Sequence, residues 1–216
     1  MYQHRITLTV LAGIIAGSTA PTAFGQRFEF GGGGGASFYN TRTVTGPSAS
    51  VEAGFKSGYA FTGYLGQIGD RLGGELRYSY ASNDMELTSG GKSFAMTGRT
   101  HAVHYDLVFY FNGKKSTVRP YVLVGGGMKQ YTGSGNSASL VQPFMATAVL
   151  TNTNEWKPLV TAGGGIRVVL NPKLHLRAEV LTYMTQVPTN VITPVKGKLD
   201  GWYFDIVPTV SLSYVW

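Results

Sequence analysis

The last fifteen residues, Trp202 to Trp216, alternate without a break between apolar and mostly polar side chains. Successive side chains of a β-strand point to opposite faces, so this segment predicts a strand with one apolar face. The apolar face comprises Trp202, Phe204, Ile206, Pro208, Val210, Leu212, Tyr214 and Trp216. Its aromatic residues lie at both ends. An apolar band between aromatic girdles is typical of strands that cross a membrane as part of a β-barrel.

The N-terminus has the pattern of a secretory signal peptide. His4 and Arg5 precede an apolar run over residues 6–16, and Ala23 and Gly25 provide the small side chains of a cleavage site. The alternative is a membrane-anchoring helix, but the apolar run is shorter than the roughly 20 residues that a spanning helix needs. We therefore expect a signal peptide over residues 1–25 and one barrel domain over residues 26–216.

The composition narrows the class of protein. The chain has 216 residues, enough for one domain, and its lack of cysteine excludes disulfides and thiolate metal sites. Its 30 glycines, 12% aromatic residues and only 13% charged residues are unusual for a soluble protein. The net charge is +7, but Lys and Arg are scattered and form no stripe. We therefore expect no nucleic-acid binding.

Seven further segments alternate in the same way, which predicts eight strands in all. They cover residues Arg27–Tyr39, Val51–Leu65, Leu72–Ser82, Arg99–Phe111, Val118–Tyr131, Lys157–Leu170 and Leu174–Thr185. The segment Val118–Tyr131 is the least regular, because both of its faces are apolar near Tyr121–Val124.

The connections between these strands differ in length. Three are short and rich in turn residues (Gly66–Arg71, Asn112–Lys115 and Asn171–Lys173). Four are long (Asn40–Ser50, Asn83–Gly98, Thr132–Trp156 and Gln186–Asp200). Short periplasmic turns and long extracellular loops are the outer-membrane pattern. The sequence therefore predicts an all-β fold, an eight-stranded antiparallel up-and-down transmembrane β-barrel.

A soluble alternative has the same alternation. A β-sandwich or a lipocalin-like barrel would turn the apolar face inward and the charges outward. The aromatic residues at strand ends favour the membrane barrel, as at Tyr78 and Tyr80, at Phe109 and Phe111, and at Trp202.

Residues 26–216 resemble the outer-membrane β-barrel family, in particular the small eight-stranded OmpA-like and porin-like barrels. The resemblance rests on Phe28–Gly35, Gly73–Tyr78, Arg119–Val122 and Tyr214–Trp216. It implies the outer membrane of a Gram-negative bacterium, reached through the periplasm. It also implies that Tyr214 and Trp216 form the signal read by the barrel-assembly machinery, and that outer-membrane lipid surrounds the barrel. The basic excess of the chain predicts lipopolysaccharide, which is anionic, as a further partner. The family shares a fold but no single activity.

Charged residues on the polar faces form the candidate site. An eight-stranded barrel is just wide enough for side chains to fill it, and buried charges must be paired. We expect an interior ion-pair network that plugs the barrel; the alternative is a narrow ion path or a gate. Its predicted members are Glu29, Glu75, Arg77, Asp106, Arg119, Arg167, Arg177, Glu179 and Asp205.

Other motifs do not support catalysis. Gly31–Gly35 matches a nucleotide-binding glycine pattern only trivially, and Gly91-Lys92-Ser93 lacks the first glycine of a phosphate-binding loop. His101 and His104 point to opposite faces of one strand and cannot share a metal ion. Some eight-stranded barrels are enzymes that modify lipid A, and the deacylase type has a His and a Ser two positions apart on one strand face. Neither His101 nor His104 has such a partner, since Val103 and Asp106 occupy those positions. We therefore expect no enzyme activity, no cofactor and no metal site.

The loop Thr132–Trp156 is unusually apolar, with Leu140, Val141, Phe144 and Leu150 among its residues. The strands could continue beyond the bilayer as a hairpin, or the loop could contact a partner or the lipopolysaccharide layer. The expected function is structural or surface-interactive, with a side-chain-plugged interior. The alternatives are a small porin or OmpW-like conduit for ions or small hydrophobic molecules, and, third, a soluble ligand-binding barrel.

Overall fold

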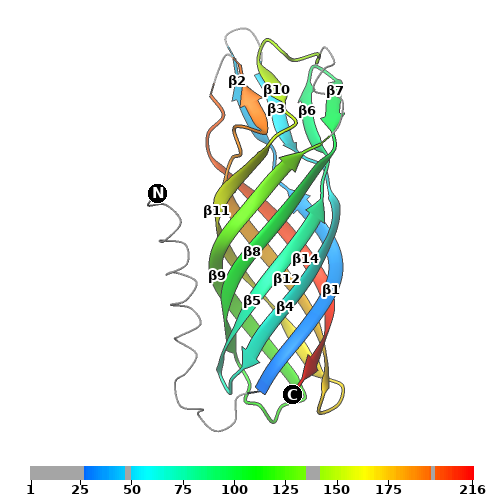
Figure 1. Cartoon of the computed structure of the whole chain (residues 1–216), viewed down its shortest axis with the longest axis vertical. Helices are drawn as coiled ribbons and strands as arrows, with labels where there is room; N and C mark the ends of the chain where they lie inside the picture. The colour runs from blue at the N-terminus through cyan, green and yellow to red at the C-terminus, as the bar shows by residue number, and fades with distance from the viewer. Residues whose placement is uncertain (1–26, 47–49, 135–141, 196–197) are drawn as a thin grey trace, which may run out of the picture.

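The computed structural model describes residues 27–46, 50–134, 142–195 and 198–216, so the predicted signal peptide over residues 1–25 lies outside the described residues. Eight strands form a closed barrel in which every neighbouring pair is antiparallel (Figure 1). They are β1 (Arg27–Tyr39), β4 (Gly58–Ile68), β5 (Leu72–Ser82), β8 (Gly98–Tyr110), β9 (Val118–Gly133), β11 (Asn154–Val169), β12 (Leu174–Gln186) and β14 (Trp202–Val215). The predicted fold class is confirmed. In the described part of the chain, no helix is long and apolar enough to cross a membrane.

The C-terminal strand closes the barrel against the first one. In the β1–β14 register, Glu29 lies opposite Val215 and Tyr39 lies opposite Asp205. Beyond the last register pair, the backbone N–H of Phe28 donates to the Trp216 carbonyl, and that of Trp216 donates back to Phe28. The rings of Phe28 and Trp216 stack with centroids 6.1 Å apart.

The outer surface of the barrel is apolar, as the alternation predicts. On β8, Val103, Tyr105, Leu107 and Phe109 are exposed, whereas His104 and Asp106 between them are buried. On β14, Trp202, Ile206 and Leu212 are exposed in the same way, as is Trp216 directly after the strand. The soluble alternative requires the apolar face to point inward, so this arrangement contradicts it.

The prediction of one continuous strand over Val51–Leu65 is wrong. The chain instead forms β3 (Ser50–Phe55) and then β4, which begins at Gly58. At the break, the N–H of Lys56 donates to the Asp84 carbonyl, and the Asn83 amide donates to the Lys56 carbonyl over 2.8 Å. These bonds end the barrel wall at this point and direct β3 into a second sheet.

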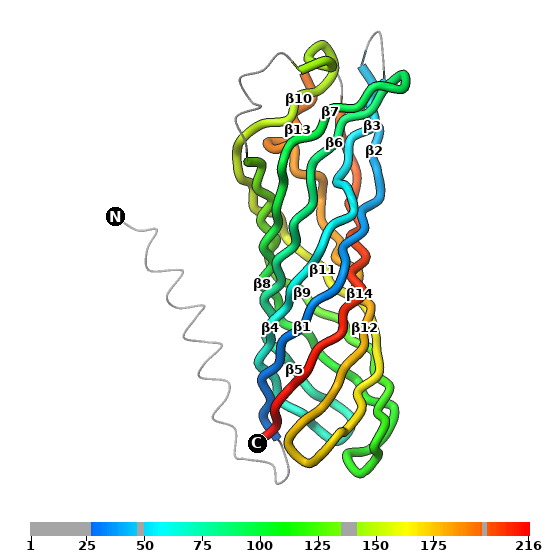
Figure 2. The backbone as a smooth tube through the Cα atoms, turned by 90° about the vertical axis from the view of Figure 1, so that its right-hand side faces the viewer, coloured from blue at the N-terminus to red at the C-terminus, as the bar shows by residue number. Residues whose placement is uncertain are grey.

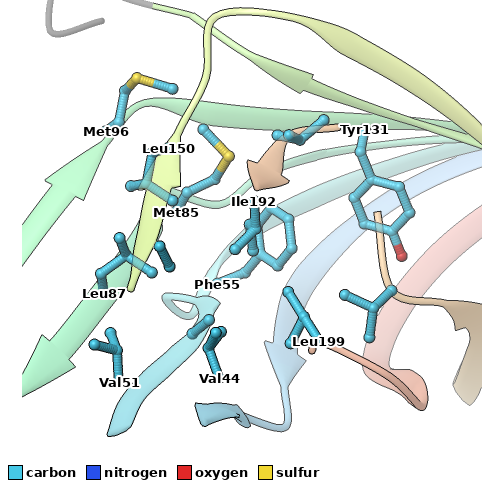
Figure 3. Packing of buried hydrophobic residues seen from close by; sticks show 14 of the residues in the cluster. Val44, Val51, Phe55, Met85, Leu87, Met96, Tyr131, Leu150, Ile192 and Leu199 are labelled. Atoms are coloured by element: carbon cyan, nitrogen blue, oxygen red, sulfur yellow. The ribbon is translucent and has the colours of Figure 1, made fainter. Parts of the chain in front are cut away.

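The long connections form a folded head above the barrel. β2 (Arg42–Thr45), β3, β6 (Met85–Ser89) and β7 (Lys92–Met96) build a four-stranded sheet, and β10 (Ala148–Leu150) pairs with β13 (Ile192–Pro194) (Figures 1 and 2). Their inward side chains share a hydrophobic core that reaches down to the upper barrel strands (Figure 3). Its members are Val44, Val51, Ala53, Phe55, Met85, Leu87, Met96, Tyr131, Ala148, Leu150, Val187, Val191, Ile192, Leu199 and Tyr203.

The head explains the apolar residues of the third long connection. Leu150 is buried in the core, and Phe144 packs against it. Leu140 and Val141 lie outside the described residues. Of the three explanations considered for this loop, extension of secondary structure beyond the barrel fits best, although β10 pairs with a strand of another connection rather than within its own hairpin.

The barrel interior as candidate functional site

All nine predicted interior charges are buried, at 4% exposure or less. Their positions follow from strand alternation. Glu75 and Arg77 are two residues apart on β5, Arg177 and Glu179 are two apart on β12, and each pair therefore shares the inward face of its strand. Because the barrel is narrow, side chains from opposite walls meet in the lumen.

Two arginines and two glutamates form a central cluster across the lumen. Arg77 Nη1 lies 2.5 Å from Glu179 Oε1, and Arg77 also pairs with Glu75 on its own strand. Arg177 donates to Glu75 Oε2 over 2.7 Å and to Glu179 Oε2 over 2.8 Å. Each guanidinium thus contacts both carboxylates, which is the arrangement that compensates buried charge best.

Tyrosines complete this cluster. The Tyr121 hydroxyl donates to Glu179 Oε2 over 2.6 Å and accepts from Arg177 Nε over 3.1 Å. The Tyr64 ring lies 4.4 Å from the Arg177 guanidinium carbon. Gly31 makes room for this ring, since a Cβ at Gly31 would collide with the end of the Tyr64 side chain.

Glu29 and Arg167 form a second pair nearer the short turns. Arg167 Nη1 donates to Glu29 Oε2 over 2.9 Å, and Nη2 donates to Oε1, so the pair is bidentate. Arg177 Nη1 lies 3.7 Å from Glu29 Oε1. This weaker contact connects the pair to the central cluster.

Asp106 lies on the other side of the central cluster. Its Oδ1 accepts a 2.5 Å hydrogen bond from the Thr161 hydroxyl and lies 2.9 Å from His104 Nδ1. Its Oδ2 is 3.8 Å from Arg77 Nε. Glu29, Glu75, Arg77, Asp106, Arg167, Arg177 and Glu179 thus form one connected group of charges.

Asp205 belongs to a separate pair near the head, with a cation that sequence reasoning missed. Lys129 Nζ lies 2.6 Å from Asp205 Oδ2, and Ser37 donates to Oδ1 over 2.5 Å. The Lys129 ammonium also lies 4.9 Å from the centre of the Tyr39 ring. Lys129 and Arg119 are ten residues apart on β9, and an even separation places both side chains on the inward face. The two-residue periodicity of the strand was therefore the signal in the sequence that could have identified Lys129.

Arg119 is buried but lies outside the ion-pair network. Its Nη2 donates to the carbonyls of Gly69 and Asp70 over 3.1 and 2.7 Å. Its guanidinium carbon lies 4.0 Å from the centre of the Tyr110 ring. Among the described residues, no carboxylate lies within ion-pair distance of it. It ties the β4–β5 turn to the barrel wall.

The buried charges are balanced in sign. Five Lys and Arg side chains (Arg77, Arg119, Lys129, Arg167 and Arg177) and five Asp and Glu side chains (Glu29, Glu75, Asp106, Glu179 and Asp205) are buried in the described barrel. An interior cavity beside Lys129, Asp205 and Tyr183 measures about 10 Å³. That is room for about one water molecule.

Tyr214 and Trp216 lie on the outer surface, at the end of the closing strand. Tyr214 packs beside Phe30 with ring centroids 5.8 Å apart, and Trp216 lies 5.9 Å from the same ring. The described residues contain no cluster of three His, Cys, Asp or Glu side chains able to hold a metal ion.

Comparison with known families agrees with this architecture. Residues 9–199 match the model of the outer membrane protein beta-barrel domain. The chain belongs to this family. Membership locates the protein in the bacterial outer membrane, where the exposed apolar band contacts lipid. Among curated proteins, no significant sequence match was found.

Solved structures of other outer-membrane proteins share the fold at low sequence identity. Neisserial surface protein A has 10% identity and a TM-score of 0.53, over 88% of this chain and 98% of its own. OprG from Pseudomonas aeruginosa has 15% identity and a TM-score of 0.52, over 88% and 95%. A major outer membrane protein from Thermus thermophilus has 12% identity and a TM-score of 0.52, over 89% and 100%. At such identities the likeness extends to the fold alone.

Proposed function

We propose that this protein is a sealed outer-membrane barrel with a structural or surface-interaction role, and that its folded head is the interacting part. One observation carries the proposal: two barriers of different chemistry lie in series along the barrel axis. The lower barrier is the charge-balanced network of arginines and carboxylates. The upper barrier is the hydrophobic core of the head.

The polar barrier resists opening for an energetic reason. Removing one partner of a buried ion pair leaves an uncompensated charge, which costs about 3–5 kcal/mol. Arg177 contacts Glu29, Glu75 and Glu179 together, so a path through this level would separate several pairs at once. The network is therefore better suited to a plug than to a gate that opens at low energetic cost.

Aromatic rings join the head to the upper barrel wall. The Phe55 ring, which belongs to a head strand, lies 5.4 Å from the Tyr131 ring and 5.6 Å from the Tyr203 ring of the barrel wall. The Tyr203 hydroxyl donates to the Ala53 carbonyl of β3 over 3.0 Å. These contacts hold the head over the upper mouth as one packed unit.

The surface supports a contact with lipopolysaccharide. Lys92, Arg99 and Lys198 are exposed at the head and the upper strand ends, where Lys56 pairs with Glu86. Cationic side chains at this level face the anionic sugars and phosphates of the outer leaflet, an attraction that salt would weaken.

Assembly is proposed to depend on Tyr214 and Trp216. Both side chains are presented on the lipid side of the closing strand, where the barrel-assembly machinery could contact them before the β1–β14 seam forms.

We propose no catalytic role. Thr161, His104 and Asp106 lie together, and a hydroxyl, an imidazole and a carboxylate are the groups of a catalytic triad. In a triad the hydroxyl bonds to the histidine, whereas the Thr161 hydroxyl donates to Asp106, and all three side chains are buried.

Solute uptake tests the proposal against a conduit for small molecules. Liposomes containing the purified protein would be diluted into solutions of small neutral sugars, and a hydrophobic fluorescent solute would be followed in parallel. A sealed barrel predicts swelling and uptake rates equal to those of protein-free liposomes. Protein-dependent uptake of either solute class would refute it and favour the conduit.

A further inference from the structure

The short-turn end of the barrel contains an open cavity with a strong excess of positive charge. The cavity measures about 600 Å³ and is lined by Arg27, Ile68, Asp70, Lys114, Lys115 and Arg119, with Val169 and His175 beside them. Figure 2 shows the β8–β9 and β11–β12 turns at the end where the C-terminus lies. In outer-membrane barrels this end faces the periplasm.

The charges around this cavity are not balanced, in contrast to those of the interior. Its lining has four Lys and Arg side chains and one carboxylate, that of Asp70. Asp70 Oδ1 accepts the backbone N–H of Lys114 over 2.9 Å, so this carboxylate also holds the β8–β9 turn. Among the described residues, no carboxylate pairs with Arg27, Lys114 or Lys115. Bringing several uncompensated cations together is unfavourable unless an anion joins them.

Arg119 provides a fixed cation in the wall of the cavity. Three main-chain carbonyls, of Asn112, Gly69 and Asp70, accept hydrogen bonds from its Nε and Nη2, and the ring of Tyr110 packs against it. A guanidinium already held in one orientation loses little entropy when it binds an anion.

We propose that this basic mouth binds a phosphate group. Ammonium and guanidinium groups are the usual protein partners of phosphate, and four cations around one concave site match an anion of two or more charges better than a single carboxylate. Two sources have this chemistry at the periplasmic side: the headgroup of an inner-leaflet phospholipid and a free phosphate compound. The site lies below the ion-pair network, so it does not depend on whether the interior is sealed.

Calorimetry with inorganic pyrophosphate tests the free source. The purified protein in a maltoside detergent would be titrated, together with the double variant Lys114→Gln/Lys115→Gln and the control Lys173→Gln, which removes an exposed cation of the β11–β12 turn that does not line the cavity. We expect the first variant to bind at least about tenfold more weakly, because two charge-assisted contacts are lost. The control should bind like the original protein. Succinate binding as tight as that of pyrophosphate would overturn the assignment to phosphate.

Nanodiscs test the lipid source. The same three proteins would be placed in phosphatidylcholine nanodiscs containing a minority of phosphatidylglycerol, and the retained lipid would be identified by native mass spectrometry. Selective retention of phosphatidylglycerol that disappears in Lys114→Gln/Lys115→Gln supports a headgroup ligand. Heat-modifiable migration on a denaturing gel verifies that each variant is folded. If neither probe shows binding that depends on Lys114 and Lys115, the proposal is wrong.

Discussion

Arg167 and Glu29 form a bidentate ion pair across the lumen, with Nη1 2.9 Å from Oε2, although their strands β11 and β1 are separated in the wall by β12 and β14. The pair therefore cross-braces the barrel rather than linking neighbouring strands. Its stability depends on mutual compensation, because both side chains are almost fully buried.

Replacing Arg167 with Met should destabilise the barrel by about 3–5 kcal/mol, because Glu29 would stay buried without its partner. Urea unfolding in lipid vesicles, followed by tryptophan fluorescence, measures the change. The control is Lys56→Met, which breaks the 3.2 Å ion pair between Lys56 and Glu86. Because the Lys56 side chain is 45% exposed, this change should lower the free energy of unfolding by no more than about 1 kcal/mol. The double variant Arg167→Met/Glu29→Gln should regain part of the loss. Equal effects of Arg167→Met and Lys56→Met would contradict the bracing role.

Replacing Trp216 with Ala should reduce insertion into the outer membrane. The change removes the stack against Phe28 at the seam and the proposed assembly signal. The readout is the heat-modifiable fraction in isolated outer membranes. Phe111→Ala is a matched control, since Phe111 and Trp216 are 59% and 58% exposed but only Trp216 hydrogen-bonds to the first strand, at Phe28. Deletion of Trp216 should also impair insertion more than shortening any long connection; equal loss in these variants would argue against a signal.

Replacing Leu87 with Ala should loosen the head and leave the barrel folded. Leu87 is fully buried in the head core, and a Leu→Ala cavity costs about 2–5 kcal/mol. Limited proteolysis of reconstituted protein should show faster cleavage in the head, with unchanged heat-modifiable migration of the barrel. Met145→Ala, at a position that is 50% exposed, should not change the cleavage rate. Simultaneous unfolding of head and barrel would indicate a single cooperative unit instead.

Gly35 should not tolerate even Ala. A Cβ at this position would collide with the Pro208 carbonyl of the neighbouring β14, so the two backbones would have to separate. Such overpacking costs about 1–3 kcal/mol. Gly63→Ala is the control, because the nearest heavy atom to its new Cβ, the Gly31 carbonyl oxygen, is 3.9 Å away. The urea midpoint should fall for the first variant only. A fall of similar size for both would mean that loss of glycine itself, rather than the contact with β14, is responsible.

Most of the barrel could be predicted from alternation alone. A strand that faces lipid on one side and a narrow polar lumen on the other must alternate, and β8 and β14 do so without interruption. The same rule assigns Glu75, Arg77, Arg177 and Glu179 to the lumen. Which charges pair with which depends on strand tilt and on the opposite wall, and a sequence pattern includes neither.

The missed features have physical causes. Lys129 follows a stretch of β9 in which Leu123 faces inward and Val124 faces outward, and two apolar faces obscure the phase of the strand. Arg119 was predicted to pair with a carboxylate but binds carbonyls of a turn, and backbone acceptors leave no sequence signature. The head strands are short, and their partners are distant in sequence, as β10 and β13 illustrate.

Single-channel recording in planar bilayers tests the sealed interior most directly. The purified protein would be inserted at low density and the current followed over a range of voltages. Because the network and the head core both block the axis, we predict no steady open steps above the protein-free baseline at any voltage that the bilayer withstands. Steady open steps of sizeable conductance, reproduced in independent insertions, would contradict a sealed barrel.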